Sequence, residues 1–349
     1  SPTSQQIFEM LDAAGYNYGE SFYDAEHAAY PNRVIYGSEV SSAVRSRGIY
    51  HLPLLPETGK ERVKLKKQLL TNPDQQCSSY DNSVVPWGQT AEFSWKMDRD
   101  RKFVAGEFVW TGFDYIGEPT PYGWPSKNSY FGIVDTCGFP KDIYYFYQSQ
   151  WTAAPMVHIL PHWNWQPGET MPVWAYTNCD SVELFLNGRS LGVKTFEPKG
   201  PLHLSWDVPF EPGTLKAVAK RGGKIVATDE VKTAGAPARI GLKADRKRIK
   251  ADGKDLVFIE VDILDAKGIL VPTAANLVNF SVSGPGRIVG VDNGNSICHE
   301  PYKGNSRSAF SGKCLVIVQS TGAQGKIIVK AVSEGLSSSS ITVNCVKNK

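Results

Sequence analysis

Glu39 is the residue of this 349-residue sequence whose position most clearly suggests chemistry. It follows the apolar run Val34-Ile35-Tyr36 and a Gly-Ser step, so it ends a predicted β-strand. In a barrel of parallel strands, the carboxyl ends of the strands form the catalytic face. A carboxylate there can act as a nucleophile. The same pattern also fits a glutamate that merely caps the following helix.

Two aromatic residues, Tyr18 and Trp110, end two further predicted strands. A tyrosine hydroxyl can hydrogen-bond a carboxylate and hold it ionised. An indole ring can stack on the apolar face of a sugar, although a tryptophan at this position also suits a protein core. Strand ends that carry Tyr, Glu and Trp in succession therefore predict a single site.

The elements that must position these residues follow an α/β pattern up to about residue 152. Strands are predicted over 13–19, 33–39 and 102–115, and helices over 23–30, 61–70 and 91–98. Alternation of strands with helices is typical of parallel βα units. The three candidate residues then lie at the same edge of one sheet.

After residue 152 the pattern changes to short alternating strands separated by turns. A first β-sandwich is predicted over 153–235, with a hairpin turn at Asn187-Gly188. The segment 234–238 is interpreted as a linker. A second sandwich is predicted over 236–349. The strands expected in the two sandwiches are 173–177, 182–186, 189–193, 202–208, 213–221, 239–244, 256–264, 277–283, 314–320 and 326–333.

The overall charge excludes some partners. The 38 Lys and Arg residues against 35 Asp and Glu leave a net charge of +3, too little to predict a nucleic-acid or anionic-membrane partner. No run of about 18 apolar residues is present, so no membrane span is expected. The six cysteines form no zinc motif and are expected to be free thiols. A local disulfide between Cys298 and Cys314 is the alternative.

Four long motifs resemble glycoside hydrolase family 2, which includes β-galactosidases and β-glucuronidases. They are AGYNYG (14–19), YPNRVIYGSEVSSAVRSRGIY (30–50), GEFVWTGFDYIGEPTPYGWP (106–125) and FGIVDTCGFPKDIYYFYQSQW (131–151). The resemblance extends through both sandwiches. It implies a multidomain fold, with the C-terminal strands of a (β/α)8 TIM barrel over 1–152 followed by two immunoglobulin-like sandwiches over 153–235 and 236–349.

The resemblance also implies a role for each candidate residue. Glu39 matches the family's nucleophile at the end of the seventh barrel strand, and Tyr18 matches the sixth-strand tyrosine that hydrogen-bonds it. Trp110 matches the eighth-strand tryptophan that packs against the sugar in the −1 subsite. Asp114 and Asn128, on the loop after the eighth strand, are further candidates for substrate contacts.

The second carboxylate of the family is not found in this sequence. The family's acid/base glutamate ends the fourth strand and usually follows an asparagine, yet no Asn-Glu pair occurs. Retaining hydrolysis needs two carboxyl groups about 5–5.5 Å apart. We therefore expect the chain to begin inside the barrel and to be inactive alone. An incomplete barrel also has exposed sheet edges, which predict marginal stability or self-association.

The choice of sugar rests on the resemblance. β-Galactosidase is favoured, with β-glucuronidase and β-mannosidase as alternatives. Glucuronidases of the family place a lysine in an Asn-x-Lys motif where this sequence has Asn128-Ser129-Tyr130, and tyrosine supplies no ammonium group. An oligo- or polysaccharide substrate is expected, and homo-oligomers are left open.

A different class of function is also open, because the sandwiches alone could be carbohydrate-binding or spacer modules. Trp163 and Trp165, in the loop 162–168, could stack on sugars or pack the first sandwich against the barrel. No cofactor is evident, although some family members use Mg²⁺ or Na⁺. The first residues have no signal-peptide character. Export to the periplasm or the cell surface is expected from the family alone.

Overall fold

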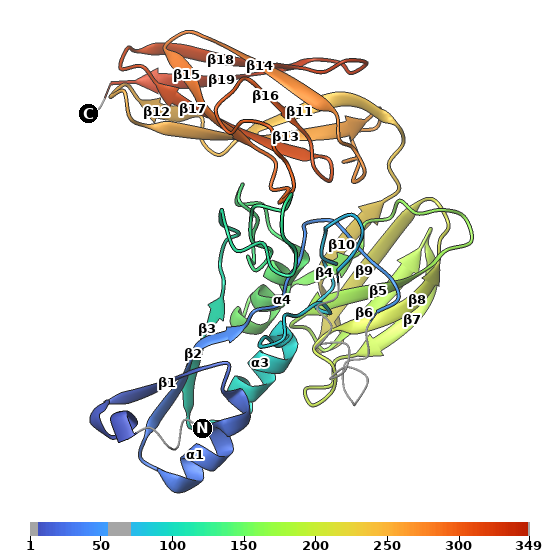
Figure 1. Ribbon diagram of the computed structural model, residues 1–349. Coiled ribbons are helices and arrows are strands. Elements are labelled where there is room, and N and C mark those ends of the chain that lie inside the picture. Colours follow the sequence, from blue (N-terminus) through green and yellow to red (C-terminus); the bar gives the residue numbers. More distant parts are fainter. Residues whose placement is uncertain (1–5, 55–70, 348–349) are drawn as a thin grey trace. The chain divides into compact units, whose positions relative to one another are not determined.

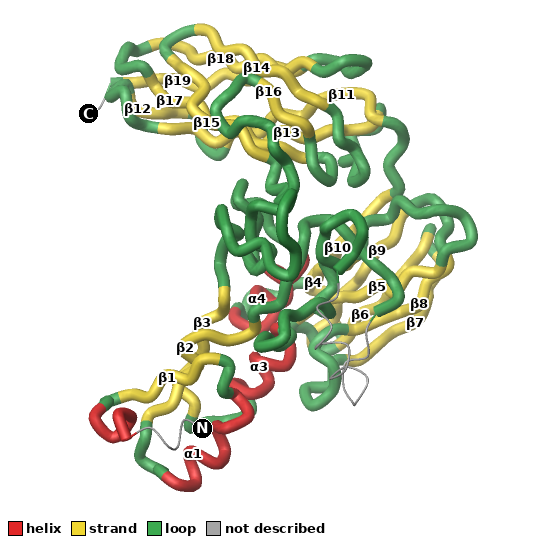
Figure 2. The backbone as a smooth tube through the Cα atoms, viewed as in Figure 1, coloured by secondary structure: helices red, strands yellow, loops and turns green. Residues whose placement is uncertain are grey.

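The computed structural model describes residues 6–54 and 71–347, and β-strands dominate it (Figure 2). The helix predicted over 61–70 lies outside the described residues. Two compact units are formed, residues 1–148 with 197–202 and residues 149–196 with 203–349. The predicted division into three domains stays a prediction.

The first unit contains a parallel three-stranded sheet (Figure 1). Its order is β1-β2-β3, and both pairs of neighbours are parallel, which confirms the predicted βα units. Thr90 begins α3, since its hydroxyl accepts a hydrogen bond from the N–H of Phe93 at 3.2 Å. The elements up to β3 are η2 (Gln6–Met10), β1 (Ala13–Asn17), η3 (Glu20–Phe22), α1 (Tyr23–Ala29), β2 (Val34–Ser41), α3 (Ala91–Arg99) and β3 (Val104–Trp110).

The register of β2 contains an irregularity just before Glu39. Tyr16 of β1 pairs with Gly37, whereas the next residue, Asn17, pairs with Glu39, so Ser38 is skipped. The alternation of buried residues shifts at the same place. Ile35 and Gly37 are buried two residues apart, whereas the next buried residue, Val40, comes three residues after Gly37. A skipped residue of this kind turns the following side chain to the other face of the sheet.

The two faces of the sheet differ in burial. Ala14, Tyr16 and Ile35 pack with Tyr23 of α1 in a buried core. The side chain of Phe108, in β3, is 67% exposed and lies edge-to-face with Tyr36, with 6.0 Å between the ring centroids.

Strand β3 ends at Trp110 and is shorter than the predicted strand 102–115. Beyond Trp110 the backbone bonds to the segment 131–134 instead of β2: the N–H of Thr111 donates to the carbonyl of Phe131 at 3.2 Å. A helix that the sequence did not suggest, α4, follows over Asp142–Trp151.

The second unit contains both predicted sandwiches. Each is built from two sheets whose neighbouring strands are mostly antiparallel. Asn187 and Gly188 have φ of 53° and 80°, so the predicted hairpin turn between β6 and β7 is confirmed. The immunoglobulin-like topology stays a prediction. The sheets of the first sandwich are β4-β5-β8 and β10-β9-β6-β7, with β4 (Val157–Leu160), β5 (Thr170–Thr177), β6 (Ser181–Leu186), β7 (Arg189–Thr195), β8 (Leu204–Pro209), β9 (Thr214–Arg221) and β10 (Lys224–Lys232).

The second sandwich has more strands than the sequence predicted. The short strands β12 and β16, together with β15 and β19, were not expected. Its sheets are β11-β13-β17-β15 and β12-β19-β18-β14-β16, with β11 (Pro237–Ala244), β12 (Arg248–Lys250), β13 (Leu256–Asp265), β14 (Leu277–Ser283), β15 (Gly286–Asp292), β16 (Ser306–Ser308), β17 (Lys313–Ser320), β18 (Gly325–Val332) and β19 (Ser339–Val346).

The structure corrects the reading of the loop 162–168. Trp163 is fully buried in the core of the first sandwich, where its indole N–H donates to the carbonyl of Glu211 at 2.9 Å. Trp165 is half-buried against the same core and stacks on His162, with ring centroids 4.6 Å apart. Trp163 is therefore a core residue of this sandwich and not an exposed sugar platform.

The segment 234–238 is held by hydrogen bonds. The side chain of Asn164 exchanges two hydrogen bonds with the backbone of Ala234, and the N–H of Gly235 donates to Asp265 at 2.9 Å. Pro237 already belongs to β11. The segment is therefore an ordered connection between β10 and β11, and its role as a linker between domains stays a prediction.

All six cysteines are free thiols, so the alternative disulfide between Cys298 and Cys314 is not formed. Within the described ranges, no helix combines the length and the apolar character that crossing a membrane requires.

Candidate active site

Tyr18, Glu39 and Trp110 lie at the carboxyl ends of three adjacent parallel strands. Glu39 pairs with Asn17 in the register of β1 and β2, so it stands beside Tyr18, the residue after β1. Trp110 closes β3 and pairs with Ser41 of β2. Because parallel strands end at a common edge, the sheet itself gathers these residues.

Tyr18 is hydrogen-bonded to Glu39 through both its side chain and its backbone. Its hydroxyl donates to Oε1 of Glu39 at 2.6 Å, and its N–H donates to the carbonyl oxygen of Glu39 at 2.8 Å. The φ of Tyr18 is 50°, a left-handed conformation that is uncommon outside glycine and marks a constrained position. A hydrogen bond from a hydroxyl to a carboxylate is short and strong, as this one is.

Ser42 is a further part of this arrangement that the sequence did not reveal. Its hydroxyl is hydrogen-bonded to the hydroxyl of Tyr18, and its side chain is fully buried. Ser41 and Ser42 both have left-handed backbones, with φ of 69° and 53°. Gly88 packs on this turn, where a Cβ would approach the carbonyl oxygens of Ser41 and Ser42 to 2.7 Å.

The electrostatics keep the hydroxyl of Tyr18 protonated. Burial, followed by the hydrogen bond to Glu39, raises the pKa of Tyr18 well above its ordinary value of 10.0. Ser42 and Trp87 act in the opposite direction as hydrogen-bond partners of the same hydroxyl. Tyr18 therefore accepts a hydrogen bond on one side and donates its proton to Glu39 on the other.

Trp110 is half-buried at the end of β3. Its ring lies edge-to-face with Tyr115, with 6.0 Å between centroids, and packs on the small buried cluster that contains Val85 and Phe131. The peptide bond to Thr111 is cis. The predicted contact between Trp110 and a sugar stays a prediction.

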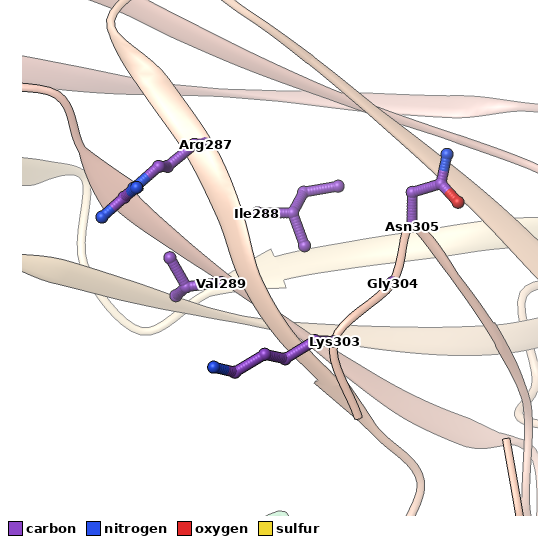
Figure 3. Close-up of a pocket in the computed structure, with 6 residues that line it drawn as sticks. All are labelled: Arg287, Ile288, Val289, Lys303, Gly304 and Asn305. Atoms are coloured by element: carbon purple, nitrogen blue, oxygen red, sulfur yellow. The ribbon is translucent and has the colours of Figure 1, made fainter. Parts of the chain in front are cut away.

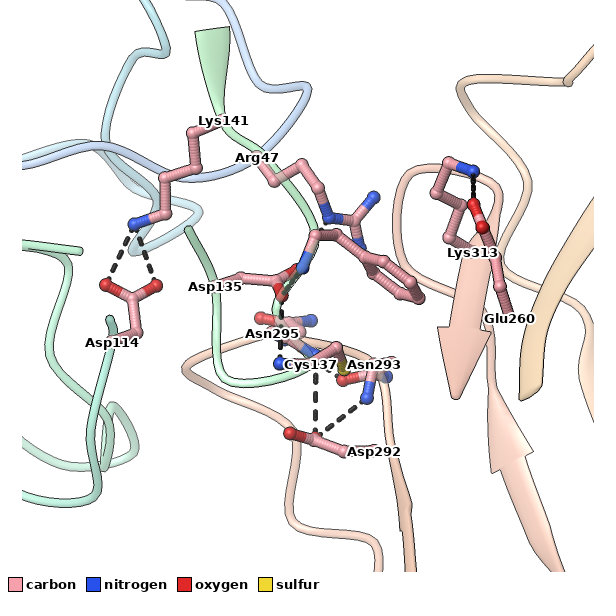
Figure 4. A network of polar contacts seen from close by, with 12 residues as sticks. Arg47, Asp114, Asp135, Cys137, Lys141, Glu260, Asp292, Asn293, Asn295 and Lys313 are labelled. Carbon is pink, nitrogen blue, oxygen red and sulfur yellow. Dashed lines mark hydrogen bonds and ion pairs between the residues drawn. The ribbon is translucent and has the colours of Figure 1, made fainter. Parts of the chain in front are cut away.

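Asp114 is buried and bound within the protein. Its carboxylate pairs with Nζ of Lys141 at 2.7 Å and accepts a hydrogen bond from the N–H of Gly132 at 2.7 Å (Figure 4). Burial raises the pKa of Asp114 to about 7 and lowers that of Lys141, while their mutual attraction opposes both shifts. These contacts give Asp114 a structural role, and its predicted substrate contact stays a prediction.

Asn128 and Tyr130 are also buried, at 1% exposure each. Asn128 forms a β-bridge with Ile116, and the hydroxyl of Tyr130 donates to the carbonyl of Gln75 at 2.6 Å. The predicted sugar contact of Asn128 therefore also lacks support from its position.

Buried ion pairs fasten the loops that follow β2 and β3. Arg45 pairs with Asp81, which also accepts hydrogen bonds from the first N–H groups of α3. Arg47 pairs with Asp135 at 2.7 Å (Figure 4), and Asp135 accepts two backbone N–H groups as well. Such pairs are tolerated in a protein interior because the remaining lone pairs are satisfied.

Three carboxylates share a buried space between β3, α3 and η3. Glu20 accepts a hydrogen bond from the hydroxyl of Ser94 at 2.8 Å, whereas both oxygens of Glu107 and one of Asp98 have no hydrogen-bond partner in the structure. Burial, reinforced by Asp98 and Glu20, raises the pKa of Glu107 to about 8. Glu107 is therefore protonated at neutral pH.

In the described part of the chain, no three His, Cys, Asp or Glu side chains are gathered as ligands for a metal ion. The candidate site brings together one carboxylate, a tyrosine hydroxyl that donates to it, and an indole ring on the neighbouring strand. A carboxylate held in this way is suited to attack an electrophilic carbon.

Comparison with known proteins gives two family matches. "Glycoside hydrolase family 2 C-terminal domain 5" matches residues 240–342, in the second sandwich. "Domain of unknown function (DUF4982)" matches residues 168–227, in the first.

Individual relatives extend the similarity over the first unit. The chain is 50% identical over 332 residues to the β-galactosidase BoGH2A of Bacteroides ovatus, covering 94% of this chain and 38% of that protein. It is 32% identical over 156 residues to a β-glucuronidase of Formosa agariphila, covering 44% of this chain and 16% of that protein. A solved β-glycosidase from Bacteroides vulgatus superimposes with a TM-score of 0.85 and 36% identity, over 96% of this chain and 45% of that one.

The fold and these matches relate the chain to the glycoside hydrolases. Within that class, it belongs to glycoside hydrolase family 2. It spans less than half the length of these relatives, 38% in the case of BoGH2A and 45% in the case of the β-glycosidase from Bacteroides vulgatus.

Proposed function

We propose that this chain supplies the nucleophile-bearing part of a retaining, exo-acting β-galactosidase. In this proposal β1, β2 and β3 are the last strands of a TIM barrel, and Glu39 is the nucleophile. The hydrogen bond of 2.6 Å from the hydroxyl of Tyr18 to Glu39, at the carboxyl ends of adjacent parallel strands, is the observation that carries it.

In the proposed reaction, an oxygen of Glu39 attacks the anomeric carbon of a terminal galactoside. A bond forms between that oxygen and the carbon while the bond to the leaving oxygen breaks. A second carboxylic acid, from a part of the enzyme outside these 349 residues, protonates the leaving oxygen. The same group then takes a proton from water, which displaces Glu39 and releases galactose.

Tyr18 and Ser42 are proposed to orient the nucleophile. The hydroxyl of Tyr18 stabilises the charge on Glu39 and fixes one of its oxygens, leaving the other to attack. In this proposal the hydroxyl of Ser42 donates to the hydroxyl oxygen of Tyr18, so the proton of Tyr18 is directed toward Glu39. Tyr18 and Ser42 are thus positioning residues that act through Glu39.

Trp110 is proposed to provide the apolar platform for the sugar in the −1 subsite. Its half-buried ring at the end of β3 supports this role. For Asp114 and Asn128, burial supports a role in shaping the loop after β3 rather than in touching the sugar directly.

Two observations favour a galactoside over a uronic acid. The identity to BoGH2A, a β-galactosidase, is 50% over 94% of this chain. By the resemblance, Tyr130 takes the place of the lysine of the family's glucuronidases, and its hydroxyl already donates to the carbonyl oxygen of Gln75. The 32% identity to a β-glucuronidase makes that activity the second candidate.

The test is covalent labelling with a 2-deoxy-2-fluoro-β-galactoside, which accumulates the glycosyl-enzyme. The protein is a chimera in which residues 1–349 replace the matching C-terminal region of BoGH2A, so that a complete barrel is present. Peptide mapping by mass spectrometry should place the label on Glu39. The variant Glu39→Gln should take up no label, and Glu9→Gln should label normally.

The other outcomes separate the alternatives. Labelling of Glu39 only by the corresponding glucuronyl or mannosyl probe would keep the mechanism and change the sugar. Labelling of another residue, or of none while unmodified BoGH2A reacts, would reject Glu39 as the nucleophile. The chain alone should show no turnover of aryl β-galactosides.

A further inference from the structure

A hollow lies at one side of the second sandwich, between β15 and the segment 303–305. β15 and β16 are the outermost strands of their two sheets, and the segment leads directly into β16. The hollow has a volume of about 490 Å³ and is lined by Arg287, Ile288, Val289, Lys303, Gly304 and Asn305 (Figure 3). The hollow is shallow and open to solvent. We call it the β15 notch.

The β15 notch carries two positive charges that no carboxylate neutralises. Arg287 donates two hydrogen bonds to the neutral amide oxygen of Gln319, at 2.7 and 3.1 Å. Lys303 is exposed and has no ion pair among the described residues, and none of the lining residues is acidic. Some other cations of this sandwich are paired, for example Lys313 with Glu260 and Asp262.

The two cations flank an apolar surface. Figure 3 shows Arg287 and Val289 on one side of the strand, with Lys303 reaching toward the same side from the neighbouring segment. Val289 has no partner in β17, because the register passes from Ile288 directly to Gly290. Irregularities of this kind on edge strands re-aim side chains, here placing Val289 between the charges.

We propose that the β15 notch is an accessory binding site for an acidic saccharide, in which Arg287 and Lys303 bind a carboxylate or sulfate group and Val289 contacts the apolar face of the ring. This proposal depends on the proposed function in one respect only, namely that the molecule bearing the anionic group is a saccharide.

The residues that line the β15 notch argue against two other classes of ligand, neutral sugars and nucleic acids. Sites for neutral sugars rely on an aromatic platform, and no aromatic residue lines this one. Nucleic acids require many phosphate contacts, whereas this site offers two cations in a chain with a net charge of +3. One acidic group on a sugar ring matches both the charge and the apolar floor.

The test is isothermal titration calorimetry of the 349-residue chain with three oligosaccharides of equal length: galacturonate, sulfated galactose and neutral galactose oligomers. Acidic oligomers should bind at least about tenfold more tightly than neutral ones, since charge-assisted hydrogen bonds are the stronger class. The double variant Arg287→Gln/Lys303→Gln should lose about tenfold or more in affinity. Whichever acidic oligomer binds more tightly identifies the anionic group.

The matched control is Arg248→Gln/Lys250→Gln, which removes one exposed Arg and one exposed Lys from β12, in the other sheet. It should stay within about twofold of the unmodified chain. Equal losses in both double variants would mean attraction by general charge and would overturn the proposal. Absence of binding, or equal binding of neutral and acidic oligomers, would overturn it too. Because no step requires hydrolysis, an inactive enzyme would leave the result unaffected.

Discussion

Replacing Glu107 with glutamine should stabilise the first unit at neutral pH, and the gain should grow as pH rises. The folded pKa of Glu107 is about 8, against an ordinary value of 4.5, because the side chain is buried beside Asp98 and Glu20. Below pH 4.5 the group is protonated in both folded and unfolded chains and has no effect on stability. Above that pH only the unfolded chain releases the proton, so ionisation favours unfolding.

The size of the effect follows from the difference between the two pKa values. Each pH unit between 4.5 and 8 lowers the free energy of unfolding by about 1.4 kcal/mol. At pH 7 the accumulated loss is therefore about 3 kcal/mol, and above pH 8 it reaches its limit. Glutamine has the shape of the protonated side chain and no charge to lose, so the variant Glu107→Gln should recover most of this amount.

Hydrogen exchange followed by mass spectrometry is the suitable assay, because peptides from β2 and β3 report the opening of this sheet locally. Exchange should be measured from pH 5 to 8 and corrected for the intrinsic rate. Glu9→Gln, at an exposed carboxylate of the same unit, is the control and should behave as the unmodified chain. An equal difference between Glu107→Gln and the unmodified chain at pH 5.5 and 7.5 would refute the reasoning.

Three further predictions concern the candidate site. In the chimera with BoGH2A, Tyr18→Phe should lower kcat about tenfold to a hundredfold, because a hydrogen bond to a charged group is lost; an unchanged kcat would remove Tyr18 from the mechanism. Ser42→Ala should lower kcat about fivefold with little change in KM, and circular dichroism should show an intact fold. Lys141→Met should destabilise the first unit by about 3–5 kcal/mol in urea unfolding, since it leaves Asp114 buried without its cation, and adding Asp114→Leu should restore much of the loss.

The sequence predicted those parts of the fold that depend on local pattern. The β-branched run before Glu39 and the Asn187-Gly188 turn are local signals, and both elements formed as expected. Helix α4 was missed because its run of aromatic residues also favours a strand. The segment forms a helix because this conformation buries Ile143 and Phe146 along one side. Their burial depends on tertiary packing, which the local sequence does not show.

The candidate site divides in the same way. Tyr18 and Glu39 could be found because strand ends are visible in the sequence. The ion pairs of Arg45 and Arg47 could not, because their partners lie 36 and 88 residues away along the chain. The role of Ser42 could not be predicted either. Its position depends on a left-handed backbone turn, and a serine in the sequence does not indicate such a turn.

The skipped residue in β2 makes the pairing register of that strand part of the candidate site. Ser38 is the one residue that the pairing with β1 passes over, and it sets the phase in which Glu39 meets Tyr18. If β2 paired regularly with β1, Ser38 would stand beside Asn17, and the side chain of Glu39 would turn to the face that carries Ile35, which is the buried core. The location of the carboxylate therefore depends on how β2 pairs with β1 and not only on which residues the strand contains: the same residues in a regular register would place no carboxylate beside Tyr18.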